Sequence, residues 1–164
     1  MTTELMLLIT LTGIGATLCM DGWALLLKYG FGIASLNYAL PGRWLLWMAK
    51  GKFFHRTIVT TPVLKGEKFA GWVFHYLTGA IFAFIPLLSA GSRWIAAPTL
   101  PAAIIAGLIS LAAPFLIMQP ALGFGVAANK MPKPKKARMM SLLAHLVYGI
   151  GLYLSAVAAA ALQF

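Results

Sequence analysis

The chain alternates between long apolar runs and shorter segments that hold most of its charge. The apolar runs cover residues 5–27, 69–90, 102–123 and 139–162. Each run is long enough to cross the roughly 30 Å hydrocarbon core of a bilayer as a helix. The pattern therefore predicts an all-α integral membrane protein, one domain with four transmembrane helices.

Two of the connecting segments have a composition of their own. Residues 41–50 combine tryptophan with basic residues, which is typical of a short helix lying in the membrane interface. Residues 129–138 contain two prolines and five cations, which predicts an irregular, solvated loop. Within the runs, Pro86, Pro114 and Pro120 are places where a helix is expected to be interrupted.

Composition and charge agree with this assignment. The chain is 61% hydrophobic and 10% charged, whereas about a quarter of the residues in a soluble domain are charged. All Lys and Arg residues except Arg93 lie in 28–68 or 124–138, and such loops are retained in the cytoplasm. We therefore expect an inner-membrane protein with both termini periplasmic. The net charge of +10 then favours anionic headgroups over nucleic acid as its partner.

The first run is expected to remain in the protein as a membrane helix. A cleavable signal peptide would begin with a basic segment and would have a shorter apolar core without a carboxylate. The run instead contains Asp21 and has no preceding basic residue. Cys19, the single cysteine, lies in the same run, so no disulfide can form within the chain.

An internal repeat relates the two halves of the chain. Gly30–Ala34 (GFGIA) follows the first run, and Gly123–Ala127 (GFGVA) follows the third. The second and fourth runs share a spacing in which a histidine, His75 or His145, stands four residues before a glycine. The pattern predicts two helical hairpins of like orientation, a parallel repeat of 5–90 and 102–162.

Asp21 is the carboxylate within an apolar run. Placing it in the bilayer costs about 2.5–3.5 kcal/mol at the centre of a helix and less near its end. Its helical neighbours are small or polar, and such a stripe is expected to face protein and not lipid. The stripe consists of Thr10, Gly13, Thr17, Asp21, Ala24 and Lys28.

Asp21, His75, Gln119 and His145 are predicted to form one polar layer, about 6–9 Å inside the cytoplasmic side of the hydrocarbon. Three interpretations remain open. The four side chains can lock helix packing, or they can bind a small molecule or ion on a proton-linked transport path. His75 and His145 can also ligate a haem iron, or a divalent metal together with Asp21. No CxxCH or HExxH motif supports a cofactor, and none is expected.

Enzyme chemistry has little support in the sequence, which contains no phosphate-binding glycine loop and no GxSxG motif. Glu67 stands between two lysines and is interpreted as a surface charge paired with them. Small residues at Gly149, Ala156 and Ala160 suggest a face for homodimerisation. The residues expected to contact lipid headgroups at the interface are Arg43, Trp44, Trp47, Lys50 and Lys52.

The chain also resembles a family of small bacterial inner-membrane proteins, the domain of unknown function 2938. The resemblance covers nearly the whole chain, and it implies a four-helix, multi-pass membrane protein without an assigned activity. No catalytic residue follows from it. It rests on Gly13-Ile14-Gly15-Ala16-Thr17 with Met20-Asp21-x-Trp23-Ala24, Leu36-Asn37-Tyr38, Gly42-Arg43-Trp44, Gly71-Trp72-x2-His75-Tyr76, Ala113-Pro114-Phe115, Met118-Gln119-Pro120 and His145.

Overall fold

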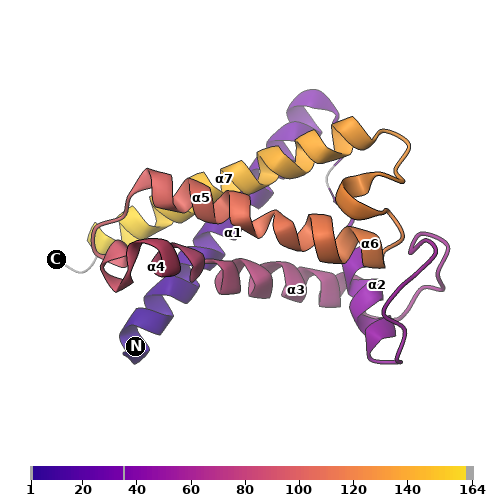
Figure 1. The fold of residues 1–164 in the computed structure, drawn as a ribbon, viewed down its shortest axis with the longest axis horizontal. Helices are drawn as coiled ribbons and strands as arrows, with labels where there is room; N and C mark the ends of the chain where they lie inside the picture. Colours follow the sequence, from indigo (N-terminus) through magenta and orange to yellow (C-terminus); the bar gives the residue numbers. More distant parts are fainter. Residues whose placement is uncertain (1, 35, 162–164) are drawn as a thin grey trace. The chain divides into compact units, whose positions relative to one another are not determined.

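A computed structural model describes residues 2–34 and 36–161, and no strand occurs among them (Figure 1). Within these residues four helical segments are long and apolar enough to cross a membrane, at Thr3–Phe31, Glu67–Ala90, Leu100–Ala121 and Pro134–Ala161. The all-helical class and the four candidate spans are thereby confirmed. The elements are α1 (Thr3–Phe31), α2 (Ala39–Met48), α3 (Glu67–Phe82), α4 (Ile85–Ala90), η1 (Ser92–Ile95), α5 (Leu100–Ser110), the π-helix η2 (Ala113–Met118), α6 (Gln119–Ala121), η3 (Val126–Ala128) and α7 (Pro134–Ala161).

The chain divides into two compact units. Unit 1 contains Met1–Ser35, Tyr76–Ser110 and Leu143–Phe164; unit 2 contains Leu36–His75 and Leu111–Leu142. The prediction of one domain with a parallel repeat of hairpins stays a prediction.

Small residues bring the helices of unit 1 close together. A side chain at Gly13 of α1 would lie 2.6 Å from Ala80 Cα of α3, and one at Gly151 of α7 would lie 2.9 Å from Ala16 Cα of α1. A side chain at Gly149 of α7 would lie 2.9 Å from the carbonyl oxygen of Ala103 in α5. Such close approach of backbones is how helices pack where the solvent is lipid, because apolar burial supplies little driving force there.

The opposite side of α1 carries large apolar side chains that are exposed. Leu11, Leu18 and Leu25 are each more than half exposed and recur every seven residues, so they share one face of the helix. The face with Gly13 and Thr17 is buried. This two-sided pattern is expected of a helix that contacts lipid on one side and protein on the other.

In unit 2 the segment between α2 and α3 is held against the segment that follows α6. The backbone N–H groups of His55 and Ile58 donate to the carbonyl oxygens of Ala121 and Leu122, both at 2.9 Å. Gly123 has a φ of +87°, and a side chain there would meet the carbonyl carbon of Arg56 at 2.6 Å. Glycine is therefore required at this position both by the backbone conformation and by the close approach.

The structure corrects two expectations about α7. The helix begins at Pro134, so residues 134–138 are helical instead of irregular; proline suits a first turn, where its missing N–H has no partner to lose. Gly149 and Ala156 are buried within unit 1, so they do not form an outer face for a second copy. Ala160 is partly exposed, and homodimerisation itself stays a prediction.

Candidate functional site

Asp21 is positioned by the contact between α1 and α3 in unit 1. The hydroxyl of Tyr76 donates to Asp21 Oδ2 at 2.7 Å, and both side chains are half-buried. One turn earlier on α1, the buried hydroxyl of Thr17 donates to its own helix at Gly13 O, 2.8 Å away. The predicted polar stripe is confirmed for these residues, since Gly13, Thr17 and Asp21 all face α3.

His145 lies in unit 1, where α7 contacts α5. Its Nδ1 lies 2.7 Å from Ser110 Oγ, and the Ser110 hydroxyl itself donates to Gly107 O at 2.7 Å. A side chain at Gly107 would overlap the carbonyl oxygen of His145, so the helices touch at this point.

His75 belongs to an aromatic cluster in unit 2. Its Nε2 lies 3.0 Å from the hydroxyl of Tyr38, and the two rings are 4.5 Å apart between centroids. Trp72 lies 4.3 Å from the Tyr38 ring and 5.9 Å from the His75 ring. Offset and edge-on ring contacts of this kind each add about 0.5–1.5 kcal/mol, so the cluster fixes the orientation of the imidazole.

Gln119 lies in unit 2 at the point where the third span changes its helical form. The π-helix η2 runs from Ala113 to Met118, and the predicted interruption near Pro114 and Pro120 is confirmed. The side chain of Gln119 is buried, and its Oε1 has no hydrogen-bond partner among the described residues. A π-helical turn is frequent at functional sites.

The four residues of the predicted polar layer are thus divided between the units. Asp21 and His145 belong to unit 1, and His75 and Gln119 belong to unit 2. Their convergence stays a prediction, as do the haem and the divalent metal. Among residues 2–34 and 36–161, no group of three or more His, Cys, Asp or Glu side chains is arranged to hold a metal ion.

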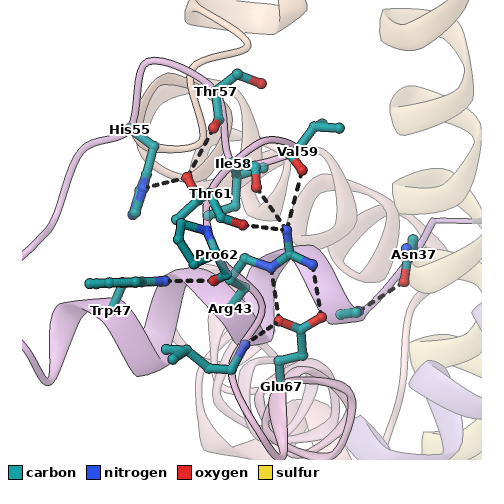
Figure 2. Close-up of polar contacts among 12 residues, drawn as sticks. Asn37, Arg43, Trp47, His55, Thr57, Ile58, Val59, Thr61, Pro62 and Glu67 are labelled. Carbon is teal, nitrogen blue, oxygen red and sulfur yellow. Dashed lines mark hydrogen bonds and ion pairs between the residues drawn. The ribbon is translucent and has the colours of Figure 1, made fainter.

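A buried ion pair organises the loop of unit 2 (Figure 2). Arg43 Nε and Nη2 donate to the two carboxylate oxygens of Glu67 at 2.8 and 2.9 Å. Arg43 Nη1 donates to the carbonyl oxygens of Ile58 and Thr61, both at 3.0 Å. The carboxylate holds the pKa of Arg43 above its ordinary value. Glu67 is therefore a buried partner of Arg43. The prediction that it is a surface charge is wrong.

The residues predicted to contact headgroups fall into two sets. Arg43 and Trp44 are buried, and the Trp44 indole donates to Phe53 O at 2.9 Å, so their role is structural. Trp47 is half-buried, and the ammonium groups of Lys50 and Lys52 lie over its ring at 5.2 and 5.5 Å. For Trp47, Lys50 and Lys52 a contact with lipid headgroups stays a prediction.

His55 lies close to this ion pair in the same loop, and its neighbours in the sequence, Phe54 and Arg56, are residue types typical of a membrane interface. The structure buries it, with 6% of its surface exposed. Its Nδ1 lies 3.0 Å from Thr61 Oγ1, whose hydroxyl donates to Thr57 O at 3.0 Å (Figure 2). The other ring nitrogen, Nε2, is buried and has no hydrogen-bond partner among the described residues.

We expect His55 to remain neutral at neutral pH. Burial lowers the pKa of its imidazole below the ordinary 6.5, and the positive charge of Lys52 adds to the effect. Below about pH 6.5 the unfolded chain takes up a proton that folded His55 does not, so its contribution to stability is lost as the pH falls. An NMR titration of the histidine ring protons, assigned with His55→Gln, measures the midpoint; one above 6.5 would contradict this expectation.

The sequence of the chain matches one known protein family. The profile of the family described as "Protein of unknown function (DUF2938)" matches residues 10–159. The chain belongs to this family. No curated protein and no solved structure matches it. The resemblance noted in the sequence is thereby confirmed, and the four apolar helices of this DUF2938 member fit a multi-pass membrane protein.

The sequence of the DUF2938 chain did not indicate which side chains contact the candidate residues. Tyr76, Tyr38 and Ser110 supply the hydrogen bonds to Asp21, His75 and His145. The sequence indicates that Tyr76 needs a polar partner, since a tyrosine hydroxyl inside an apolar helix does, but it does not indicate which residue that partner is. The burial of His55 had no signal in the sequence, because it depends on which segment covers the loop.

Proposed function

We propose that this DUF2938 protein is transport-related, and that Asp21 binds a proton or a monovalent cation on a path through the membrane. The observation that carries the proposal is the pair of Asp21 and Tyr76, a carboxylate that accepts a hydroxyl proton at 2.7 Å within the spans. Ionisable residues inside spans are rare and mark ion pathways by default. A positive charge is the ligand that best stabilises a carboxylate there.

The partial exposure of Asp21 also supports this role. A carboxylate that only locked two helices together would be expected to be closed off, as Thr17 is, yet Asp21 is half-buried on the same face of α1. The distribution of basic residues supports an orientation with 28–68 and 124–138 in the cytoplasm and both termini outside. Asp21 then lies toward the cytoplasmic side of the membrane.

Ion movement into proteoliposomes tests the proposal. An imposed inside-negative potential should drive protons, followed with an enclosed pH dye, or ²²Na⁺ into vesicles that contain the native chain. Asp21→Asn should abolish this movement, and Tyr76→Phe should slow it about tenfold, because a hydrogen bond to a charged group contributes about 1.5–3 kcal/mol.

Thr10→Val is the matched control, because the Thr10 hydroxyl donates to Met6 O in its own helix at 2.8 Å. This variant should behave as the native chain does. The proposal fails if native vesicles move neither ion, or if a folded Asp21→Asn chain moves ions as fast as the native one.

A structural role is the second candidate, and the geometry around His145 favours it for that residue. Ser110 satisfies the imidazole where Gly107 lets α5 touch α7. Hydrogen bonds between membrane helices contribute about 0.6 kcal/mol on average. His145→Ala should therefore weaken the fold while Asp21-dependent ion movement persists in the chains that do fold.

A further inference from the structure

The segment between α2 and α3 exposes large apolar side chains, although it lies outside the candidate spans. Within it, loop 53–63 contains four such side chains that are each more than half exposed: Phe53, Phe54, Val59 and Val63. Single exposed apolar residues are ordinary on a protein surface, whereas a concentration of them marks a surface that contacts a partner or a membrane. The loop belongs to unit 2, so the proposed role of Asp21 in unit 1 does not use it.

Helix α2 holds this loop through side-chain donors that reach its carbonyl oxygens. The indole N–H groups of Trp44 and Trp47 donate to Phe53 O at 2.9 Å and to Pro62 O at 3.1 Å. Between these ends, Arg43 donates to three further carbonyl oxygens of the loop (Figure 2). An irregular backbone is costly near hydrocarbon unless the protein satisfies its polar groups. These carbonyl oxygens meet that requirement without water.

The loop has a buried side and an exposed side. Ile58 is fully buried in a cluster with Trp44 and Leu122, and its backbone N–H donates to Leu122 O at 2.9 Å. Val59, the next residue, is 60% exposed, and its carbonyl oxygen is turned toward Arg43 (Figure 2). The loop therefore presents backbone oxygens to α2 and apolar side chains to the outside.

The charge around the loop is positive. Four exposed cations flank or interrupt it: Lys50, Lys52, Arg56 and Lys65. Glu67, the carboxylate of unit 2, is paired with Arg43 and does not neutralise them. Apolar side chains bordered by cations are typical of a surface that lies in the interface of an anionic membrane.

The place of the loop in the chain keeps it near a membrane surface. The candidate span Glu67–Ala90 begins four residues after Val63. Four residues extend at most about 14 Å. The headgroup layer on each side of the hydrocarbon core is itself roughly 5–8 Å thick. The end of the loop is therefore within reach of the interface that this span crosses.

We propose that loop 53–63 inserts its apolar side chains into the interface of an anionic membrane. Phe54, Val59 and Val63 then lie at the boundary of the acyl chains, and the cations beside them contact the headgroups. The charge pattern favours the cytoplasmic face for this loop, where anionic lipids supply a negative surface. The partner is lipid of the membrane that holds the spans, and α2 is the support of the inserted surface.

A nitroxide label measures how deep the loop lies. Because Cys19 is the single cysteine, the full chain with Cys19→Ala accepts one label through Thr60→Cys, at an exposed position of the loop. Nanodiscs of phosphatidylcholine and phosphatidylglycerol are loaded with one chain each. Electron paramagnetic resonance with oxygen and a water-soluble nickel complex should place this label about 5–10 Å below the membrane surface. A label at Lys133→Cys, an exposed position of the other basic segment, is the matched control and should remain in water.

Substitution of the exposed apolar side chains tests what holds the loop there, without disturbing buried residues. The triple variant Phe54→Ser, Val59→Ser and Val63→Ser should return the Thr60 label to water, because no apolar surface is then left to insert. The proposal is overturned if the label is equally deep in this variant. It is also overturned if the label in the native loop is as accessible to nickel as the one at Lys133.

The cations are tested through the lipid. The Thr60 label should lie deeper as the fraction of phosphatidylglycerol rises, and Lys52→Gln with Arg56→Gln should remove this dependence. Lys135→Gln with Lys136→Gln, two exposed cations in the first turn of α7, should leave it unchanged. Shielding that occurs only in nanodiscs with two chains would identify a second copy as the partner and would overturn the proposal.

Discussion

Arg43→Met is expected to destabilise the chain by about 3–5 kcal/mol, because it leaves the carboxylate of Glu67 buried without its cation. The carbonyl oxygens of Ile58, Val59 and Thr61 lose their donor as well. These carbonyls fix the segment between α2 and α3, so its detachment should precede global unfolding. Chemical unfolding in detergent measures the free energy, and tryptic cleavage within 49–66 reports the loop.

A graded series separates the ion pair from the loop contacts. Glu67→Gln should cost less than Arg43→Met, because the guanidinium keeps its three carbonyl acceptors and one amide oxygen. The exchange Arg43→Glu with Glu67→Arg should not restore stability, because a carboxylate at position 43 would face carbonyl oxygens. Lys50→Met, an exposed cation nearby, should change stability by less than about 0.5 kcal/mol. Full recovery in the exchanged variant would show that the pair alone matters.

The pairing of Arg43 with Glu67 also marks the limit of what the sequence predicts. The four spans followed from composition, because twenty apolar residues in a row leave few alternatives to a membrane helix. The partner of a charged loop residue depends on how a loop folds back, and 24 positions separate these two residues. Lys65 and Lys68 stand much closer to Glu67 in the chain, so the sequence alone favours a surface pairing with them.

The candidate site shows the same division between local and non-local information. Asp21 could be singled out because a carboxylate within an apolar run is costly wherever that helix packs. Its stripe of small neighbours predicted a protein-facing side, which the contacts of Gly13 and Thr17 with α3 confirm. The choice of Tyr76 as partner could not be deduced, because it depends on the register between α1 and α3. That register is set by the glycines at which the helices touch.

Residues that carry the family resemblance meet at such a contact in unit 2. Tyr38 and Gly42 come from one segment, and Gly71, Trp72 and His75 come from another. Side chains at either glycine would overlap backbone atoms across the contact: Gly42 against the carbonyl oxygen of Glu67, and Gly71 against that of Tyr38. The tilted and edge-on rings of Tyr38, Trp72 and His75 lie on this same crossing of α2 and α3. The two glycines therefore determine whether the aromatic cluster can form.

Gly71→Ala is expected to destabilise the chain by about 3 kcal/mol, at the upper end of the range for overpacking, because the atoms in its way are backbone and cannot rotate aside. Gly42→Ala should have a similar effect, and the double variant should cost less than the sum, since both act on one crossing. Gly22→Ala is the matched control: its added methyl meets nothing within 4 Å, and alanine is favoured over glycine in a helix by about 1 kcal/mol. Unfolding in detergent, followed with ring fluorescence of the aromatic cluster, measures all four variants. If Gly71→Ala is as stable as Gly22→Ala, α2 and α3 do not cross at these glycines.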